Sequence, residues 1–209
     1  MDKTHPSHPD FWSSRYLAGK TPWDFGGVPA DLQKFLKVKP RGSEPTTRRR
    51  VLIPGCGSGH EIKAFAAAGF DVTALDFSPA AVELARKAAG PALAKHIITG
   101  DFFSYDFPAA SFDFIYERTF LCSLLPDRRP AYRDRVAQLL KYRGILVGYF
   151  YYQKPVIKEG PPYGFVWGAA DELFSRYFLL GKDEPVADSL PVFAKRERWQ
   201  EWHRTSFCG

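Results

Sequence analysis

Short apolar runs alternate along this 209-residue chain with segments in which apolar residues recur at helical spacing. The apolar runs predict strands at residues 50–54, 71–76, 96–99, 112–116 and 145–151. The segments between them predict helices at residues 60–68, 79–89, 130–140 and 169–180. Two more strands are expected in residues 186–204, the last at 199–203. This alternation is typical of an α/β fold with a doubly wound, mostly parallel sheet.

Turn and capping residues mark the boundaries of these elements. Residues up to about 36 indicate short amphipathic helices, which Gly19–Pro22 and Gly26–Gly27 interrupt. Residues 37–49 are rich in Pro, Gly, Thr and charge and are expected to form a linker. Ser78 and Pro79 are the expected N-cap and first residue of a helix. We therefore expect a single domain over residues 1–209, with its core in 48–209 and a separate helical segment in 1–36.

The turn after the first strand carries three glycines, Gly55, Gly57 and Gly59. Asp76 ends the second strand about 20 residues later, which is the arrangement of a nucleotide-binding βαβ unit. In such a unit the ligand approaches the turn, here Gly55, Cys56 and Gly57, and the carboxylate accepts both ribose hydroxyls. The spacing G-x-G-x-G differs from the dinucleotide fingerprint and is associated with S-adenosylmethionine, which has no pyrophosphate. The alternative, a glycine turn without a ligand, is disfavoured by a carboxylate at this spacing.

Composition is that of an ordinary globular protein, with 45% hydrophobic and 25% charged residues. No apolar run approaches the ~20 residues that span a bilayer, and residues 1–10 lack a signal-peptide core. Three scattered cysteines without a C-x-x-C pair indicate a reducing cytoplasm. The basic residues behind the net charge of +6 are dispersed, so we expect no nucleic-acid partner, no membrane association and a monomer.

Four predicted strands end in residues suited to a binding site: Gly55–Gly59, Asp76-Phe77, Asp101-Phe102 and Glu117-Arg118-Thr119. The carboxyl ends of parallel strands line one crevice, so these residues are expected to converge. In such a site Asp76 takes the ribose hydroxyls and Asp101 accepts the adenine amino group. Phe77 and Phe102 flank the adenine. Arg118 is a cation for the donor's carboxylate or for an anionic acceptor.

Three blocks of the chain resemble the thiopurine methyltransferase superfamily: FWSSRYLAGKTPWD (Phe11–Asp24), IPGCGSGHE (Ile53–Glu61) and FDFIYERTFLCSLLPDRRPAY (Phe112–Tyr132). Within it the chain is most similar to the plant-type halide and thiol methyltransferases, which also share GPPY (Gly160–Tyr163). The resemblance covers about Phe11 to Leu180. It implies a class I methyltransferase fold, Rossmann-like, with an antiparallel last strand and an N-terminal helical lid.

The resemblance also implies roles for individual residues. Trp12, Tyr16 and Trp23 match aromatic positions of a lid that folds over the donor, with Tyr16 where the family commonly has Trp. Gly55, Asp76, Asp101 and Phe102 match donor-binding positions. Arg118 matches an arginine of the thiopurine enzymes, whereas the halide and thiol enzymes have Tyr there, so the resemblance leaves the acceptor open.

Two other site types are disfavoured. GPPY follows the fifth strand, whereas the D/N-P-P-Y loop of DNA amino-methylating enzymes follows the fourth, and Gly160 offers no side chain. His5 and His8 lack a third ligand nearby, so no metal site is expected.

These observations predict a methyltransferase that converts S-adenosylmethionine to S-adenosylhomocysteine while methylating a small thiol or hydrosulfide. Arg118 and Tyr163 are the candidate catalytic residues, and Tyr151 and Tyr152 are further candidates for the acceptor pocket. No general base is assigned. Two alternatives stay open: another acceptor, such as a halide, a selenium or tellurium oxyanion or a heterocyclic thiol, and a non-enzymatic module that binds the donor or its product.

Overall fold

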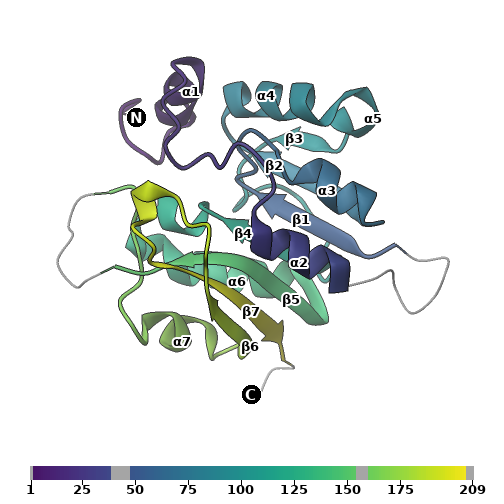
Figure 1. Ribbon diagram of the computed structural model, residues 1–209, viewed down its shortest axis with the longest axis vertical. Coiled ribbons are helices and arrows are strands. Elements are labelled where there is room, and N and C mark those ends of the chain that lie inside the picture. Colours follow the sequence, from purple (N-terminus) through teal and green to yellow (C-terminus); the bar gives the residue numbers. More distant parts are fainter. Residues whose placement is uncertain (1, 39–47, 154–159, 206–209) are drawn as a thin grey trace. The chain divides into compact units, whose positions relative to one another are not determined.

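The computed structural model describes residues 2–38, 48–153 and 160–205. They fall into two compact units, Met1–Tyr105 and Asp106–Gly209 (Figure 1). The sequence-based expectation of a single domain stays a prediction. The expected linker, residues 37–49, lies mostly outside the described residues.

The first unit contains three parallel strands in the order β3-β2-β1. Their bounds are β1 Arg50–Pro54, β2 Asp71–Asp76 and β3 Ile97–Thr99. The inner residues of β1 and β2 are almost all buried, as is typical of parallel strands covered on both faces. The helices of the unit that follow β1 are α3 Ile62–Ala67, α4 Pro79–Ala89 and α5 Pro91–Ala94. The strands confirm the βαβ unit predicted from the sequence.

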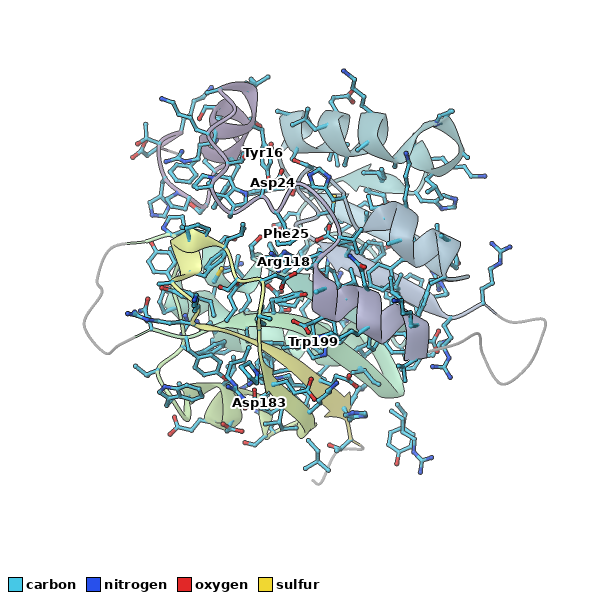
Figure 2. All side chains as sticks on the ribbon, in the orientation of Figure 1. Tyr16, Asp24, Phe25, Arg118, Asp183 and Trp199 are labelled. Carbon is cyan, nitrogen blue, oxygen red and sulfur yellow. The ribbon has the colours of Figure 1, made fainter. Side chains whose placement is uncertain are left out.

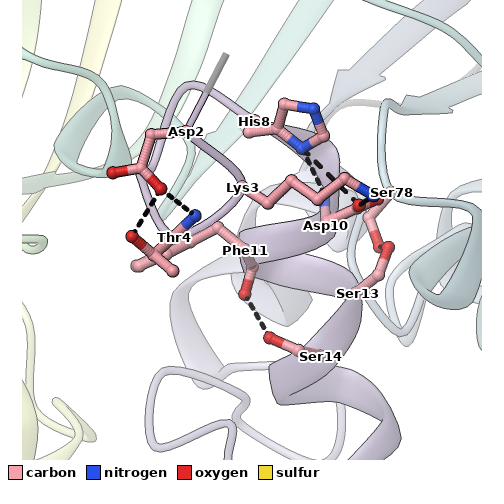
Figure 3. Close-up of polar contacts among 9 residues, drawn as sticks. All are labelled: Asp2, Lys3, Thr4, His8, Asp10, Phe11, Ser13, Ser14 and Ser78. Atoms are coloured by element: carbon pink, nitrogen blue, oxygen red, sulfur yellow. Dashed lines mark hydrogen bonds and ion pairs between the residues drawn. The ribbon is translucent and has the colours of Figure 1, made fainter.

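Two helices precede β1, α1 Pro9–Leu17 and α2 Ala30–Val38. The His8 side chain caps α1 by accepting a hydrogen bond from the backbone of Asp10. Helix α1 lies beside α4, and the hydroxyls of Ser13 and Ser78 are 2.8 Å apart (Figures 1 and 3). Ser78 is also the N-cap of α4, as predicted, and Pro79 follows it. One serine thus starts α4 and holds the N-terminal helix against it.

The second unit contains four strands in the order β4-β5-β7-β6. They are β4 Phe112–Arg118, β5 Leu140–Tyr151, β6 Phe178–Pro185 and β7 Glu197–Arg204. Strands β4 and β5 are parallel, whereas β7 is antiparallel to both of its neighbours, which confirms the expected antiparallel last strand. The helices are α6 Arg129–Leu139 and α7 Ala169–Phe174, with single 3₁₀ turns η1 Leu121–Ser123, η2 Pro126–Arg128 and η3 Pro191–Phe193.

Two expectations for the second unit are wrong. The helix expected over 169–180 ends at Phe174, and Phe178–Pro185 form a strand instead. The apolar run of Phe178, Leu179 and Leu180 is compatible with both a helix and a strand. Its pairing with β7 makes it a strand. Residues 186–204 contain only one strand, β7, because Pro191–Phe193 form a 3₁₀ turn.

Strand β4 is longer than expected and reaches Arg118, so Glu117 and Arg118 lie within the strand. Its neighbour β5 approaches closely at Gly148. A Cβ there would lie 1.9 Å from the carbonyl oxygen of Glu117, so only glycine fits. The pairing of β4 with β5 therefore depends on Gly148 directly beside the candidate site residues.

Aromatic residues fill much of the second unit's core, among them Trp199, Trp202, Tyr132, Phe150, Phe174 and Phe178. Aromatic residues make up 16% of the chain, and packing in this core accounts for part of them. None of the helices in residues 2–38, 48–153 and 160–205 is both long and apolar enough to cross a bilayer.

Candidate active site

The glycine turn after β1 is held by the carboxylate of Asp76 at the end of β2. Oδ2 of Asp76 accepts a hydrogen bond from the backbone of Gly57 at 3.0 Å, and Oδ1 accepts one from Ser78 at 2.8 Å. Burial raises the pKa of Asp76 to about 6, although these backbone donors oppose the shift. At neutral pH the structure therefore places a buried carboxylate against the turn, and its role toward ribose hydroxyls stays a prediction.

Gly57 is required by its surroundings. Its φ is +52°, and a Cβ would lie 2.7 Å from the hydroxyl oxygen of Tyr16. The ring of Tyr16 therefore comes directly onto the glycine turn. Cys56 beside it is buried, and burial raises the pKa of its thiol, so it is a packing residue rather than a nucleophile.

The three aromatic residues predicted for the lid lie together. The ring of Trp23 meets that of Trp12 edge to face at 5.3 Å and that of Tyr16 at 6.0 Å. The indole nitrogen of Trp23 donates to the Tyr16 hydroxyl at 3.3 Å, and that of Trp12 donates to the carbonyl of Pro6 at 2.8 Å. The structure thus brings the N-terminal aromatic cluster to the glycine turn.

Asp24 fastens this segment to the turn. Its Oδ2 accepts from the Ser58 hydroxyl at 2.5 Å, and its Oδ1 lies 2.9 Å from Nε2 of His60. We call these two contacts the Asp24 clasp; Figure 2 labels Asp24 and Tyr16. Sequence reasoning missed Asp24 and Ser58. The available signal was that Asp24 closes the T-P-W-D block. His60, which directly follows the glycine turn, is the second partner of Asp24.

The residues after β3 form a tight turn that the side chain of Asp101 stabilises. Oδ1 of Asp101 accepts from the backbone of Phe103 at 3.0 Å, and Oδ2 lies 3.4 Å from the Ser104 hydroxyl. Asp101 is exposed and Phe102 is buried, while Phe77 after β2 is half-buried. The adenine contacts expected of Asp101, Phe77 and Phe102 stay predictions, as does the convergence of all four strand ends.

In the second unit, Arg118 ends β4 with only 8% of its surface exposed. Its guanidinium carbon lies 4.3 Å from the centre of the Tyr149 ring, which meets Trp199 edge to face at 5.2 Å. Nη1 of Arg118 is 3.9 Å from Oε1 of Glu197, a buried carboxylate at the start of β7. Figure 2 labels Arg118 and Trp199. An aromatic face and a carboxylate thus position this cation.

Glu117, the neighbour of Arg118, braces the chain after β4. Its Oε1 accepts from the backbone of Leu121 at 2.7 Å, and its Oε2 accepts from the Tyr132 hydroxyl at 2.8 Å. Burial raises the pKa of Glu117 to about 7. Thr119 lies between Glu117 and Leu121 in the chain. Its φ is +61°, a strained conformation for a β-branched residue. Such strain often occurs at functional sites and is maintained here by the Glu117 brace.

The GPPY segment lies against the same turn. The backbone of Tyr163 donates to the carbonyl of Cys122 at 2.6 Å. Arg129 donates to the carbonyls of Tyr163 and Gly164 at 2.8 and 2.9 Å. The structure therefore brings the segment of Tyr163 next to the turn that follows Arg118.

The other two tyrosines proposed for the acceptor pocket are largely buried. The Tyr152 hydroxyl accepts from Gln200 at 2.9 Å, and its ring stacks on Trp167 at 4.6 Å. Tyr151 packs on Phe193 at 5.3 Å. These contacts favour packing for Tyr152, and the role of Tyr151 at an acceptor stays a prediction.

A model of the thiopurine S-methyltransferase family matches residues 7–204. The chain belongs to this family. It is 35% identical to a probable thiol methyltransferase 2 of Arabidopsis thaliana, over 73% of this chain and 66% of that protein. The chain thus spans just under two thirds of that relative, and the same holds for thiocyanate methyltransferase 1 of Brassica oleracea. A thiopurine S-methyltransferase of Vibrio atlanticus (strain LGP32) is 27% identical, over 91% of this chain and 92% of that protein.

Solved structures share the fold at low identity. The 1,6-didemethyltoxoflavin-N1-methyltransferase of Burkholderia thailandensis, solved with S-adenosylhomocysteine, superposes with a TM-score of 0.73 at 18% identity, over 95% of this chain and 87% of that one. The magnesium protoporphyrin IX methyltransferase of Synechocystis PCC 6803, solved with S-adenosylmethionine, gives 0.72 at 16%, over 98% of both chains. The fold is that of the class I methyltransferases, as the sequence predicted.

Proposed function

We propose that the chain is an S-adenosylmethionine-dependent methyltransferase that methylates the sulfur of a small thiol or of hydrosulfide. One observation carries the proposal: in a member of this family, a buried carboxylate and a glycine turn lie together under an aromatic segment. The relatives named thiol methyltransferase and thiopurine S-methyltransferase support sulfur as the acceptor atom. The proposal includes a monomeric cytoplasmic enzyme without a nucleic-acid partner. The described cysteines, Cys56 and Cys122, are free thiols, in keeping with a reducing compartment.

The residues of the first unit fit the donor. Asp76 offers a buried acceptor for ribose hydroxyls, and Gly57, which has no side chain, lets the hydroxyl of Tyr16 come onto the turn. The donor supplies a sulfonium methyl group that a nucleophile attacks in line. The chain's own contribution is to bind the donor at Asp76 and the turn, and to exclude water with Trp12, Tyr16 and Trp23.

Arg118 and Tyr163 are proposed to hold the acceptor. A free thiol has a pKa of about 8.5, so only a few per cent is ionised at pH 7. A guanidinium near the sulfur stabilises the thiolate and raises that fraction. Tyr163 is placed by its backbone bond to Cys122 beside the turn after Arg118. Because a thiolate is a strong nucleophile, most of the remaining acceleration comes from orientation.

An acceptor panel tests the function. The protein is incubated with methyl-labelled S-adenosylmethionine and, in turn, with a small alkyl thiol, hydrosulfide, a thiopurine, iodide and thiocyanate. We expect methyl thioether from the alkyl thiol and methanethiol from hydrosulfide. Turnover of iodide alone would replace sulfur with halide as the acceptor. Binding of S-adenosylhomocysteine without turnover of any acceptor would show a binding module instead.

A further inference from the structure

Glu197 is a buried carboxylate on β7, and its position beside Arg118 invites a chemical role. Only 3% of Glu197 is exposed, and Oε1 lies 3.9 Å from Nη1 of Arg118. That separation is too long for a direct hydrogen bond but short enough for strong attraction. A sulfur atom at ordinary hydrogen-bond distance from Nη1 of Arg118 can also lie at that distance from Oε1 of Glu197, because these two atoms are only 3.9 Å apart. The spacing of the two groups is therefore compatible with one sulfur atom in contact with both.

The neighbouring carboxylate, Glu117, is occupied differently. Both of its oxygens accept hydrogen bonds within the brace after β4, from Leu121 and Tyr132. Glu197 is anchored through Oε2, which accepts from the Ser189 hydroxyl at 2.7 Å, while Oε1 is directed toward the guanidinium. Of these two glutamates, Glu197 is the one placed to exchange a proton at Arg118.

We propose that Glu197 accepts the proton of the thiol acceptor bound at Arg118. This inference rests on the proposed function. The S–H bond breaks, its proton forms an O–H bond with Glu197, and its electron pair stays on sulfur beside the guanidinium. The sulfur pair then forms the new bond to the donor's methyl carbon, and the pair of the broken carbon–sulfonium bond neutralises the donor sulfur. Glu197 returns its proton to water, so the products are a methyl thioether, S-adenosylhomocysteine and a proton.

The surroundings of Glu197 suit this role. Burial raises its pKa above that of an ordinary carboxyl, and Asp188 adds to the rise. Arg118 and the donors from Ser189 and Leu190 act in the other direction. Two more titratable groups lie near Glu197. They are Tyr151, which pairs with Glu197 between β5 and β7, and Cys122. Burial thus makes Glu197 a stronger base than an exposed carboxylate, closer to a thiol in proton affinity.

The proposal separates acceptors by whether they carry a proton. A thiol needs a base at neutral pH, whereas iodide and thiocyanate do not. The negative charge of Glu197 also weakens the attraction of Arg118 for an anion. Glu197 therefore favours protonated thiols over halide-like anions.

The test compares wild type, Glu197→Gln and a matched control, Glu184→Gln, on the exposed strand β6. The rates kcat/KM are measured for an alkyl thiol and for iodide or thiocyanate, from pH 7 to 9.5. A thiol of pKa about 8.5 is roughly 3% ionised at pH 7. We therefore expect Glu197→Gln to lose about 30-fold on the thiol at pH 7 and to recover to within about twofold at pH 9.5. Its rate with the anion should stay the same or rise.

Each outcome decides the matter. Equal losses with thiol and anion, or a thiol loss that persists at pH 9.5, would overturn the proton-acceptor role. If wild type makes no methyl thioether, the proposed function fails, and this inference with it. Ser189→Ala provides a second variant should Glu197→Gln not fold. Removing that hydroxyl raises the pKa of Glu197, so the acidic limb of the thiol profile should move to higher pH; an unmoved limb would count against the role.

Discussion

Replacing Asp76 by Asn tests the donor site with the least disturbance to the fold. Asp76 accepts backbone hydrogen bonds from Gly57 and Ser78, so Asp76→Ala would leave buried donors unsatisfied, at about 1–3 kcal/mol each. Asn keeps one oxygen for Ser78 and loses the charge that would accept ribose hydroxyls. The change thus separates the binding role from most of the structural one.

The expected loss follows from the charge-assisted hydrogen bond to the ligand. Such a bond contributes roughly 1.5–3 kcal/mol, so affinity for S-adenosylhomocysteine should fall about 10- to 150-fold. The wild type should also show a pH effect. Burial raises the pKa of Asp76 to about 6, and a proton competes with the ribose hydroxyls. Its affinity should be constant above pH 6 and fall by up to about tenfold per unit below it.

Calorimetric titration with S-adenosylhomocysteine between pH 5 and 8 measures both effects. In Asp76→Asn the affinity should be low and flat across this range. Asp71→Asn, the same chemical change at the opposite end of β2, serves as the control. Unchanged affinity in Asp76→Asn, or the same pH dependence in both proteins, would remove Asp76 from the donor site.

Three further predictions concern the lid, the acceptor and stability. Asp24→Ala breaks the Asp24 clasp, so limited proteolysis should cut Phe11–Trp23 faster in the variant than in wild type. S-adenosylhomocysteine should protect this segment more in wild type than in the variant. Equal cutting rates with and without S-adenosylhomocysteine in wild type would refute the lid. Arg118→Ala should slow thiol methylation more at pH 7 than at pH 9.5 at saturating donor, and a defect independent of pH would assign Arg118 to the donor alone. Burial disfavours the ionised form of Glu117 and raises its pKa to about 7, so the free energy of unfolding should fall by roughly 2–4 kcal/mol as pH rises from about 4.5 to 7. In Glu117→Gln, the free energy of unfolding measured in urea should not show this fall.

Much of the fold could be predicted because local sequence agrees with it. The buried strands are short β-branched runs closed by turn residues, and Ser78-Pro79 start α4 as their capping chemistry requires. Strand β6 could not be predicted, because its apolar residues fit a helix until β7 pairs with them. The grouping of Gly57, Asp76 and the aromatic cluster, which we propose as the donor site, follows from spacing and resemblance.

Contacts between distant residues were beyond such reasoning. Asp24 meets Ser58 across 34 positions, and no local pattern joins them. Glu197 stands in a charged run, A-K-R-E-R-W, that is typical of an exposed segment. The period of two along β7 places it on the same face as Trp199, and this was the usable signal. The expected strand began only at 199, so that signal was missed.

One measurement tests the central claim most directly. The protein, in excess over S-adenosylmethionine carrying a deuterated methyl group, is mixed with a small alkyl thiol, and products are followed by mass spectrometry through a single turnover. The account predicts equal amounts of deuteromethyl thioether and S-adenosylhomocysteine, with Asp76→Asn much slower at subsaturating protein. Donor that binds yet stays intact in the presence of the thiol would contradict it.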